Sequence, residues 1–247
     1  MLHLELGELS AVVTGGPDRV GGGDGPVVVL MHGYGAPAED LVPLFQVLEV
    51  PREVRFVFPA APLALDPKVP AAFSGRAWWP LDMVELNEIA ASGRIERLQA
   101  MDPAGLPAAR AQMEGLLDAL TTTLNAAPES IVIGGFSQGA MLATDLVLSS
   151  GRPFAGLAIL SGTLMRRAAW TASAPTRRGL RVLQSHGRSD PIVPFANAEA
   201  LRDLLSQAGL EVEWLAANGG HGIPDGAVER LAAFIRSTTA PGFSAGV

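Results

Sequence analysis

The sequence predicts an α/β fold in which a mostly parallel central sheet carries helices on both faces and an antiparallel hairpin forms at the N-terminus. Short, continuously apolar runs bounded by turn residues recur along the chain, as is typical of strands buried on both faces of a parallel sheet. Longer amphipathic segments separate these runs, and the alternation of strand and helix indicates βαβ units. The 247 residues can bury a core without disulfides, and we expect one domain over residues 1–237 with a flexible tail at 238–247.

The predicted hairpin pairs residues 2–6 with residues 10–14, two alternating segments that Gly7 and Glu8 join. A glycine cluster at residues 21–25 comes next. Such a cluster binds phosphate when a helix follows it, whereas here a strand follows, so we interpret it as a turn. The strands predicted from continuous apolar runs cover residues 27–31, 54–58, 131–133, 157–160, 181–184 and 211–215.

The helices predicted from amphipathic periodicity cover residues 38–48, 107–124, 138–149, 194–208 and 224–237. Gly209 directly follows the fourth of them and is a suitable C-terminal stop. The alternation breaks at residues 60–106, which are rich in alanine and proline and contain one short predicted helix at residues 83–91. Because long segments of this kind in compact domains usually form lids or binding loops, we expect residues 60–106 to form part of a substrate pocket.

The composition excludes several classes of function. The chain has no cysteine, which excludes a disulfide framework, a cysteine-ligated metal site and a thiol nucleophile. The net charge of −7 argues against nucleic acid as the main partner, because phosphate binding requires a basic face. The one lysine, Lys68, stands between two prolines in a predicted exposed loop and is the single candidate for Schiff-base chemistry.

Neither a membrane span nor a targeting segment is predicted. The longest purely aliphatic runs, such as residues 27–31, are far shorter than the ~18 residues that a span needs. The first residues alternate in polarity instead of forming the charged and apolar regions of a signal peptide. We therefore expect a cytoplasmic protein with no integral membrane segment.

The strongest chemical signal is the sequence Gly135-Phe136-Ser137-Gln138-Gly139, which joins a predicted strand to a predicted helix. A nucleophile on a tight strand-to-helix turn needs small residues two positions to either side, because the backbone there is crowded. The serine also stands at a helix N-terminus, where free N–H groups favour developing negative charge. We interpret Ser137 as a nucleophile; the alternative is a tight turn with a serine N-cap.

A serine nucleophile needs a base and an orienting acid, which follow it here in the order acid, then histidine. His221 lies among three glycines after the last predicted strand, which lets the imidazole approach the serine, and we predict it as the base. His186, at the end of the preceding predicted strand, is the alternative base.

Asp190 is the predicted acid, because it lies in a loop at the carboxyl end of a strand, where α/β sites are built. Asp225 follows the predicted base and is therefore in the wrong order, and Asp203 lies in the middle of a predicted helix.

The oxyanion of such a reaction needs two backbone N–H donors. The residue after the nucleophile, Gln138, supplies one, and Tyr34 in the loop after an early strand is the candidate for the other. His32 precedes this loop, and we expect it to hold the loop through hydrogen bonds. The four histidines include no i, i+4 pair, so we predict no metal site, and we predict no cofactor.

Together these motifs resemble the phospholipase/carboxylesterase family of α/β-hydrolases, which includes acyl-protein thioesterases and bacterial carboxylesterases. The motifs that carry the resemblance are His32-Gly33-Tyr34-Gly35, Gly135 to Ala140, Ser161-Gly162, His186 to Pro194 and Gly220-His221-Gly222. The resemblance covers roughly residues 10–237. It implies an α/β-hydrolase fold, a triad of Ser137, Asp190 and His221, and an oxyanion hole formed by Tyr34 and Gln138.

The sequence departs from the family in the segment expected to form the pocket. The family carries a Trp-Phe-Asp element there, whereas this chain has Trp78-Trp79 with Asp82 three residues later. We expect Trp78 and Trp79 to line the acyl pocket, with core packing as the alternative.

Leu164 and Met165 are predicted to line the same groove. Arg76 and Arg188 are candidates for a phosphate head group only through their neighbours in sequence, and we interpret Arg166-Arg167 as a solvated charge pair.

The sequence thus predicts a serine carboxylesterase whose partner is a small-molecule ester with a short- to medium-chain acyl group. Lysophospholipids and acyl thioesters are further candidate substrates. Two alternatives remain open: a non-catalytic receptor or interaction module on the same fold, and a serine peptidase on that fold.

Overall fold

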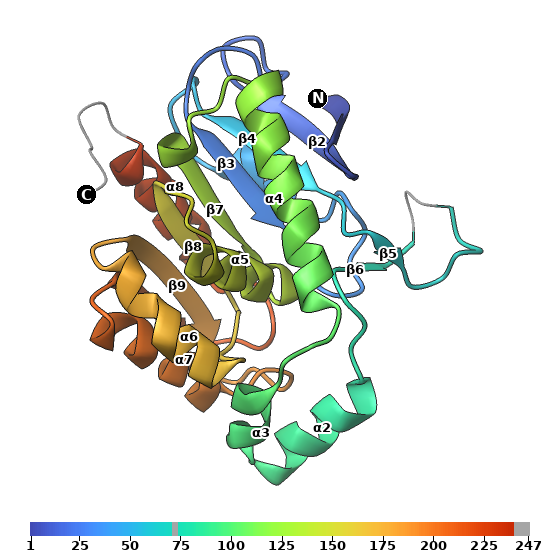
Figure 1. Cartoon of the computed structure of the whole chain (residues 1–247), viewed down its shortest axis with the longest axis vertical. Helices are drawn as coiled ribbons and strands as arrows, with labels where there is room; N and C mark the ends of the chain where they lie inside the picture. The colour runs from blue at the N-terminus through green and yellow to red at the C-terminus, as the bar shows by residue number, and fades with distance from the viewer. Residues whose placement is uncertain (71–73, 240–247) are drawn as a thin grey trace.

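The computed structural model describes residues 1–70 and 74–239, and it contains an eight-stranded sheet with helices on both faces (Figure 1). The strand order is β1-β2-β4-β3-β7-β8-β9-β10. The strands are β1 (Leu2–Leu6), β2 (Leu9–Gly15), β3 (Val27–Met31), β4 (Arg55–Pro59), β7 (Ile131–Phe136), β8 (Gly156–Leu160), β9 (Arg181–Gly187) and β10 (Glu211–Ala217). Strand β2 pairs antiparallel with β1 and β4, and all other neighbours are parallel, which confirms the predicted sheet and hairpin.

Side chains that alternate along the strands form two separate apolar layers. Val27, Val29 and Met31 of β3 face one layer, whereas Val28 and Leu30 face the other. Both faces of the central strands are therefore buried, which explains why these strands are continuously apolar in sequence.

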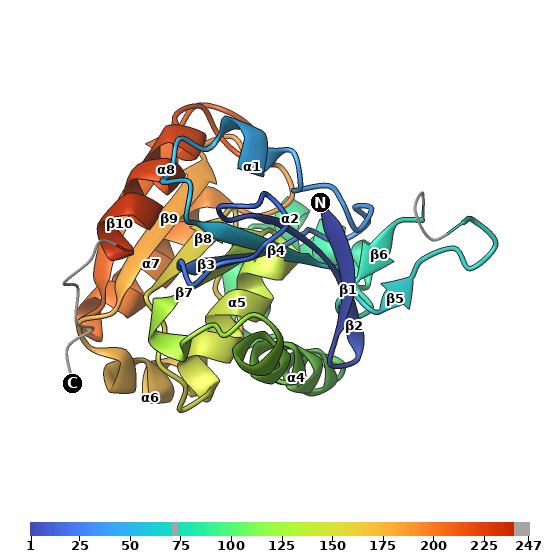
Figure 2. The same ribbon diagram turned by 90° about the horizontal axis from the view of Figure 1, so that it is seen from above.

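Helices α4 to α7 cover the first layer, and α1 and α8 cover the second (Figure 2). The helices are α1 (Leu44–Val47), α2 (Met83–Ser92), α3 (Ile95–Ala100), α4 (Leu106–Thr123), α5 (Gln138–Ser149), α6 (Arg167–Ser173), α7 (Phe195–Gln207) and α8 (Ala227–Thr238). None of the helices in the described part of the chain has the length and apolarity of a membrane-spanning segment.

The predicted helix at residues 38–48 is wrong over most of its length, since only α1 forms. Before α1 the backbone makes short-range bonds, from the Asp40 N–H to the Pro37 carbonyl and from the Val42 N–H to the Glu39 carbonyl. Pro43 has no N–H to donate and disfavours a helical conformation in the residue before it. The chain therefore passes through successive turns before it becomes helical.

The predicted tail begins too early, because Thr238 belongs to α8. Its side chain is buried and donates a hydrogen bond to the Phe234 carbonyl at 2.8 Å. Residues 240–247 of the predicted tail lie outside the described residues.

Residues 60–106 contain more regular structure than predicted. The expected helix at 83–91 is confirmed as α2, and it is followed by α3, which was not predicted. A short hairpin of β5 (Leu63–Ala64) and β6 (Arg76–Ala77) projects from the body, and α2 and α3 lie beyond the carboxyl ends of the parallel strands (Figure 1).

The expectation that Arg166-Arg167 is solvated is wrong for Arg166 and is confirmed for Arg167, which is exposed although it also bonds to Gln99. The Arg166 guanidinium contacts Asp145, a fully buried carboxylate of α5, at 2.7 Å, and Arg167 donates to Gln99 at 2.5 Å. Asp145 also accepts hydrogen bonds from Arg110 and Trp170, each at 2.9 Å. A buried carboxylate is stable only when paired in this way.

The turn between β7 and α5 packs directly against the backbone of β3. A Cβ atom added at Gly139 would lie 2.2 Å from the Met31 carbonyl oxygen, and one added at Gly135 would lie 2.4 Å from the same atom. Only glycine fits at these two positions, as the sequence motif predicts.

We expect Gly139→Ala to lower the free energy of unfolding by about 3 kcal/mol or more, because the added methyl group must displace backbone in the central strand. Gly115→Ala is the matched control. Gly115 lies within α4 and has no atom within 4 Å of an added Cβ, so this change should raise stability by roughly 0.5–1 kcal/mol. Urea unfolding of both variants measures the difference, and equal stabilities would contradict the close approach at Gly139.

Candidate active site

Ser137 occupies a strained position between the last residue of β7 and the first residue of α5. Its backbone has φ 53° and ψ −117°, a combination that costs a non-glycine residue on the order of 1–3 kcal/mol. The Ser137 N–H donates to the Leu160 carbonyl of β8 at 2.9 Å, which fixes the turn to the sheet. The strain therefore persists because the neighbouring strands determine the backbone path.

The structure brings Ser137, His221 and Asp190 together in one hydrogen-bonded chain. His221 Nε2 lies 2.9 Å from Ser137 Oγ, and His221 Nδ1 lies 2.7 Å from Asp190 Oδ2. Because the carboxylate can only accept, Nδ1 carries the hydrogen and Nε2 is free to accept the serine proton. The ring of Phe136 packs against the imidazole at 5.1 Å between centroids.

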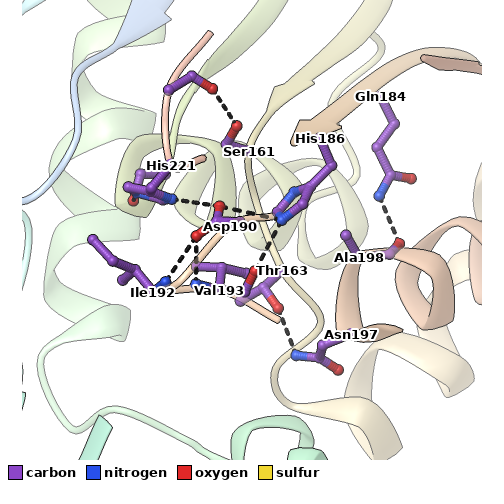
Figure 3. A network of polar contacts seen from close by, with 12 residues as sticks. Ser161, Thr163, Gln184, His186, Asp190, Ile192, Val193, Asn197, Ala198 and His221 are labelled. Atoms are coloured by element: carbon purple, nitrogen blue, oxygen red, sulfur yellow. Dashed lines mark hydrogen bonds and ion pairs between the residues drawn. The ribbon is translucent and has the colours of Figure 1, made fainter. Parts of the chain in front are cut away.

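Four donors surround the buried carboxylate of Asp190 (Figure 3). Oδ1 accepts the N–H groups of Ile192 and Val193, both at 2.8 Å. Oδ2 faces His221 and, at 3.3 Å, the Nε2 atom of His186. Burial by itself raises the pKa of Asp190, but the hydrogen bonds from both histidines and from the Val193 N–H outweigh it, so this pKa lies well below the usual aspartate value.

His186, the alternative base in the sequence, contacts the acid and not the serine. It is fully buried at the end of β9 and lies across Asp190 from His221 (Figure 3). The other two acids that we weighed, Asp203 and Asp225, are both exposed.

The loop after β3 runs beside the serine turn. A Cβ atom added at Gly33 would lie 2.9 Å from the Phe136 ring and 3.3 Å from Ser137 Cβ. Tyr34 follows in this loop, and both Tyr34 and Gln138 line the same pocket as Ser137 and His221. Both residues therefore lie at the pocket wall beside the serine, and their role as oxyanion donors stays a prediction.

His32 holds this loop, as predicted. Its Nε2 accepts the Ala61 N–H at 3.1 Å, so its Nδ1 is the donor to the Gly33 carbonyl at 2.9 Å. Burial lowers the pKa of His32, which agrees with a neutral ring.

An apolar pocket opens beside Ser137 and His221. Its lining residues are Tyr34, Trp79, Leu81, Met83, Leu86, Leu98, Met101, Pro103, Phe136, Ser137, Gln138, Met141, Thr163, Met165, Ile192, Val193 and His221. Several of them come from residues 60–106, as expected, and Trp79 and Met165 are at the predicted place.

The predictions for Trp78 and Leu164 are wrong, because neither lines the pocket and both belong to the buried core. Trp78 donates its indole N–H to the His32 carbonyl at 2.9 Å and packs against the His32 ring. Leu164 is fully buried, and its carbonyl accepts a hydrogen bond from Asn197. In each pair the neighbouring residue, Trp79 or Met165, faces the pocket instead.

Two contacts that position the site were not predicted. The Gln138 side chain accepts the Trp78 N–H at 2.9 Å and donates to the Trp79 carbonyl at 2.8 Å, which ties the pocket wall to the serine turn. Ser161 Oγ donates to the Gly222 carbonyl at 2.6 Å and so holds the loop that carries His221.

The two candidate phosphate ligands do not reach the pocket. Arg76 donates to the Ala61 and Pro62 carbonyls, and Arg188 lies over the Phe195 ring at 5.1 Å. In residues 1–70 and 74–239 we find no cluster of three histidine or carboxylate side chains suited to a metal ion.

Solved structures with the same fold include two esterases. The crystal structure of esterase PE8 is 26% identical in sequence, covers 93% of this chain and 99% of its own, and superposes with a TM-score of 0.75. The carboxylesterase of Bacillus cereus, at 21% identity and a TM-score of 0.66, covers 94% of this chain and 95% of its own, and shows the shared fold.

Two relatives are similar in sequence. Acyl-protein thioesterase 1 of Mycosarcoma maydis is 33% identical over 163 residues, and the match spans 62% of each chain. A probable carboxylesterase of Oryza sativa subsp. japonica is 27% identical over 214 residues, which are 85% of this chain and 76% of that protein. The match to the thioesterase is thus confined to less than two thirds of its length.

The family model described as Phospholipase/Carboxylesterase matches residues 22–239, which include the serine turn, the Asp190 loop and the His221 loop. This match extends over most of the chain and over every element that borders the pocket. The chain belongs to the phospholipase/carboxylesterase family.

Proposed function

We propose that the protein is a serine carboxylesterase that hydrolyses carboxylic esters through an acyl-enzyme. One observation carries the proposal: the unbroken hydrogen-bonded chain from Ser137 through His221 to Asp190, placed at the wall of an apolar pocket. The family membership and the esterase and thioesterase relatives support the same reaction class.

In the proposed reaction Ser137 Oγ attacks the ester carbonyl while His221 Nε2 takes its proton. Asp190 stabilises the imidazolium and keeps it oriented, and the backbone N–H groups of Tyr34 and Gln138 stabilise the oxyanion. Collapse of the tetrahedral intermediate transfers the proton from His221 to the departing alcohol. A water molecule, deprotonated by His221, then attacks the acyl-enzyme and releases the acid and the free serine.

The volume and the lining of the pocket support the proposal that the substrate carries a short- to medium-chain acyl group. Its volume of about 150 Å³ is below the roughly 300–1,000 Å³ typical of sites for drug-sized ligands. Apart from Ser137, His221, Gln138 and Thr163, its lining is aliphatic, aromatic or methionine, which suits an acyl chain. Acyl thioesters and lysophospholipids remain candidate donors, and the cytoplasmic location expected from the sequence is part of this proposal.

We expect Ser137→Ala to lower kcat by roughly 10⁴-fold or more, because the acyl-enzyme cannot form. Hydrolysis of p-nitrophenyl butyrate measures the loss, and mass spectrometry after treatment with an organophosphonate should show no adduct on the variant. Ser206→Ala changes an exposed serine of α7 and should retain wild-type activity and labelling. A Ser137→Ala protein that keeps most of its esterase activity would overturn the assignment.

We expect kcat/KM for p-nitrophenyl esters to rise by a few-fold for every two added carbons and then level off when the pocket is full. Each methylene contributes up to about 0.8 kcal/mol when fully buried, so the slope cannot exceed roughly 15-fold for two carbons and is smaller where burial is partial. A series from acetate to laurate, with an acyl thioester and a lysophospholipid run alongside, measures both the chain length at the plateau and the preferred donor. A profile that does not respond to chain length would exclude this pocket as the acyl site.

The lowered pKa of Asp190 predicts the shape of the acid limb of activity. Asp190 remains ionised at every pH above about 4, since its pKa lies below the usual value of roughly 3.9. Asp190 then adds no ionisation of its own to the acid limb, so log kcat/KM should fall with a slope of one. A slope of two between pH 4 and 7 would contradict this assignment.

The acid itself is tested by Asp190→Asn, which should lower kcat by about 10⁴-fold at neutral pH because an amide stabilises the wrong imidazole tautomer. Asp225→Asn is the matched control, since Asp225 is exposed and lies four residues from His221 in sequence. It should leave kcat unchanged.

A further inference from the structure

We propose that His186 is a positioning residue that holds the Asp190 carboxylate in place for His221. It does so by donating its Nε2–H to Oδ2, the same oxygen that faces His221 Nδ1 (Figure 3). The inference rests on the proposed function, because it assigns a role within the same catalytic chain.

The contacts of Nε2 establish which way this hydrogen bond runs. Nε2 of His186 lies 3.0 Å from the Val193 carbonyl oxygen and 3.3 Å from Asp190 Oδ2. Both neighbours are acceptors, so Nε2 carries the hydrogen and shares it between them. One ring N–H therefore connects the carboxylate to the far end of its own loop.

The other ring nitrogen shows that His186 does more than fill space. Among the residues that the structure describes, Nδ1 has no hydrogen-bonding partner although it is buried. A buried polar atom without a partner is destabilising, and an apolar side chain of similar size would avoid it. What histidine adds at this position is the donor at Nε2, which lies within reach of both the Val193 carbonyl and the carboxylate.

His186 also has the rigid support that a positioning residue needs. It lies in β9, between β8 and β10, in register with Ala216 of β10. The Phe195 ring packs against it at 6.2 Å between centroids. His221, by contrast, lies in a glycine-rich loop, and it exchanges protons during the proposed reaction. Of the two imidazoles on Oδ2, His186 is the one whose position is fixed by the sheet.

Without His186 the carboxylate would keep its two backbone donors on Oδ1, but Oδ2 would be held only by His221. Rotation of the carboxylate then becomes easier, and displacements of about 1 Å in a catalytic group cost up to roughly 100-fold in rate. The substrate pocket is built by other residues, so substrate binding should be little affected. The expected signature is therefore a loss in kcat with an unchanged KM.

The test compares His186→Phe, which keeps a ring but removes the donor, with His186→Gln, whose amide nitrogen can occupy the position of Nε2. Gln184→Leu is the matched control: Gln184 lies two residues earlier on the same face of β9, is fully buried, and donates to the Ala198 carbonyl of α7. The readouts are kcat and KM for p-nitrophenyl butyrate and the rate of Ser137 labelling by paraoxon. If the phenylalanine variant does not fold, His186→Met replaces it.

We expect His186→Phe to lower kcat and the labelling rate by about 10- to 100-fold with KM within about twofold of wild type. His186→Gln should recover most of this loss, and Gln184→Leu should show wild-type kcat even if its thermal stability is reduced. Wild-type kcat in His186→Phe, or equal losses in the glutamine, phenylalanine and Gln184→Leu variants, would overturn the inference while the proposed function stands. A wild-type protein that neither hydrolyses esters nor reacts with paraoxon would overturn the proposed function, and the inference with it.

Discussion

The contact on which the site depends is the backbone approach between β3 and the turn that carries Ser137. Glycines at positions 135 and 139 bring this turn against the Met31 carbonyl, and the bond from Ser137 N–H to β8 fixes it from the other side. The strained conformation of Ser137 is thereby imposed by β3 and β8, the two strands on either side of β7. The loop that carries Tyr34 continues directly from Met31, so the same contact also brings the proposed oxyanion donors to the serine.

Two buried carboxylates organise the surroundings of this turn, each in a different way. Asp190 is stabilised as an anion by donors from its own loop and from two histidines, which keeps it charged beside the proposed base. Asp145, two turns into α5, pairs with arginines from α4 and from the loop after β8. Arg166 also donates its backbone N–H to the Met101 carbonyl, so this ion pair fixes two pocket segments relative to the serine turn.

The sequence was sufficient for the sheet, for most of the helices and for the three residues now found in one hydrogen-bonded chain, because each depends on local pattern or on position at a strand end. The prediction from sequence placed a strand end too early where polar residues follow an apolar run. Strand β9 was predicted to end at Gln184 but continues to Gly187, and the polar residues in that extension include His186. The pairing of Asp145 with Arg166 joins residues 21 apart in sequence, and only the packing of α5 against the loop after β8 reveals it.

The two walls of the pocket are held in place to different degrees. This difference bears on which acyl groups the pocket accepts. On one side Trp79 is held through its carbonyl by the Gln138 side chain, and Met165 precedes an arginine paired with the buried Asp145. On the other side α2 packs chiefly against α3, whereas α3 also packs against α6 and α7, and α2 presents Met83 at an exposed position of the pocket wall. Methionine side chains adapt to irregular shapes at little cost. Differences in acyl preference within this fold are therefore expected to originate in α2, because this helix can change shape without disturbing the turn that carries the serine.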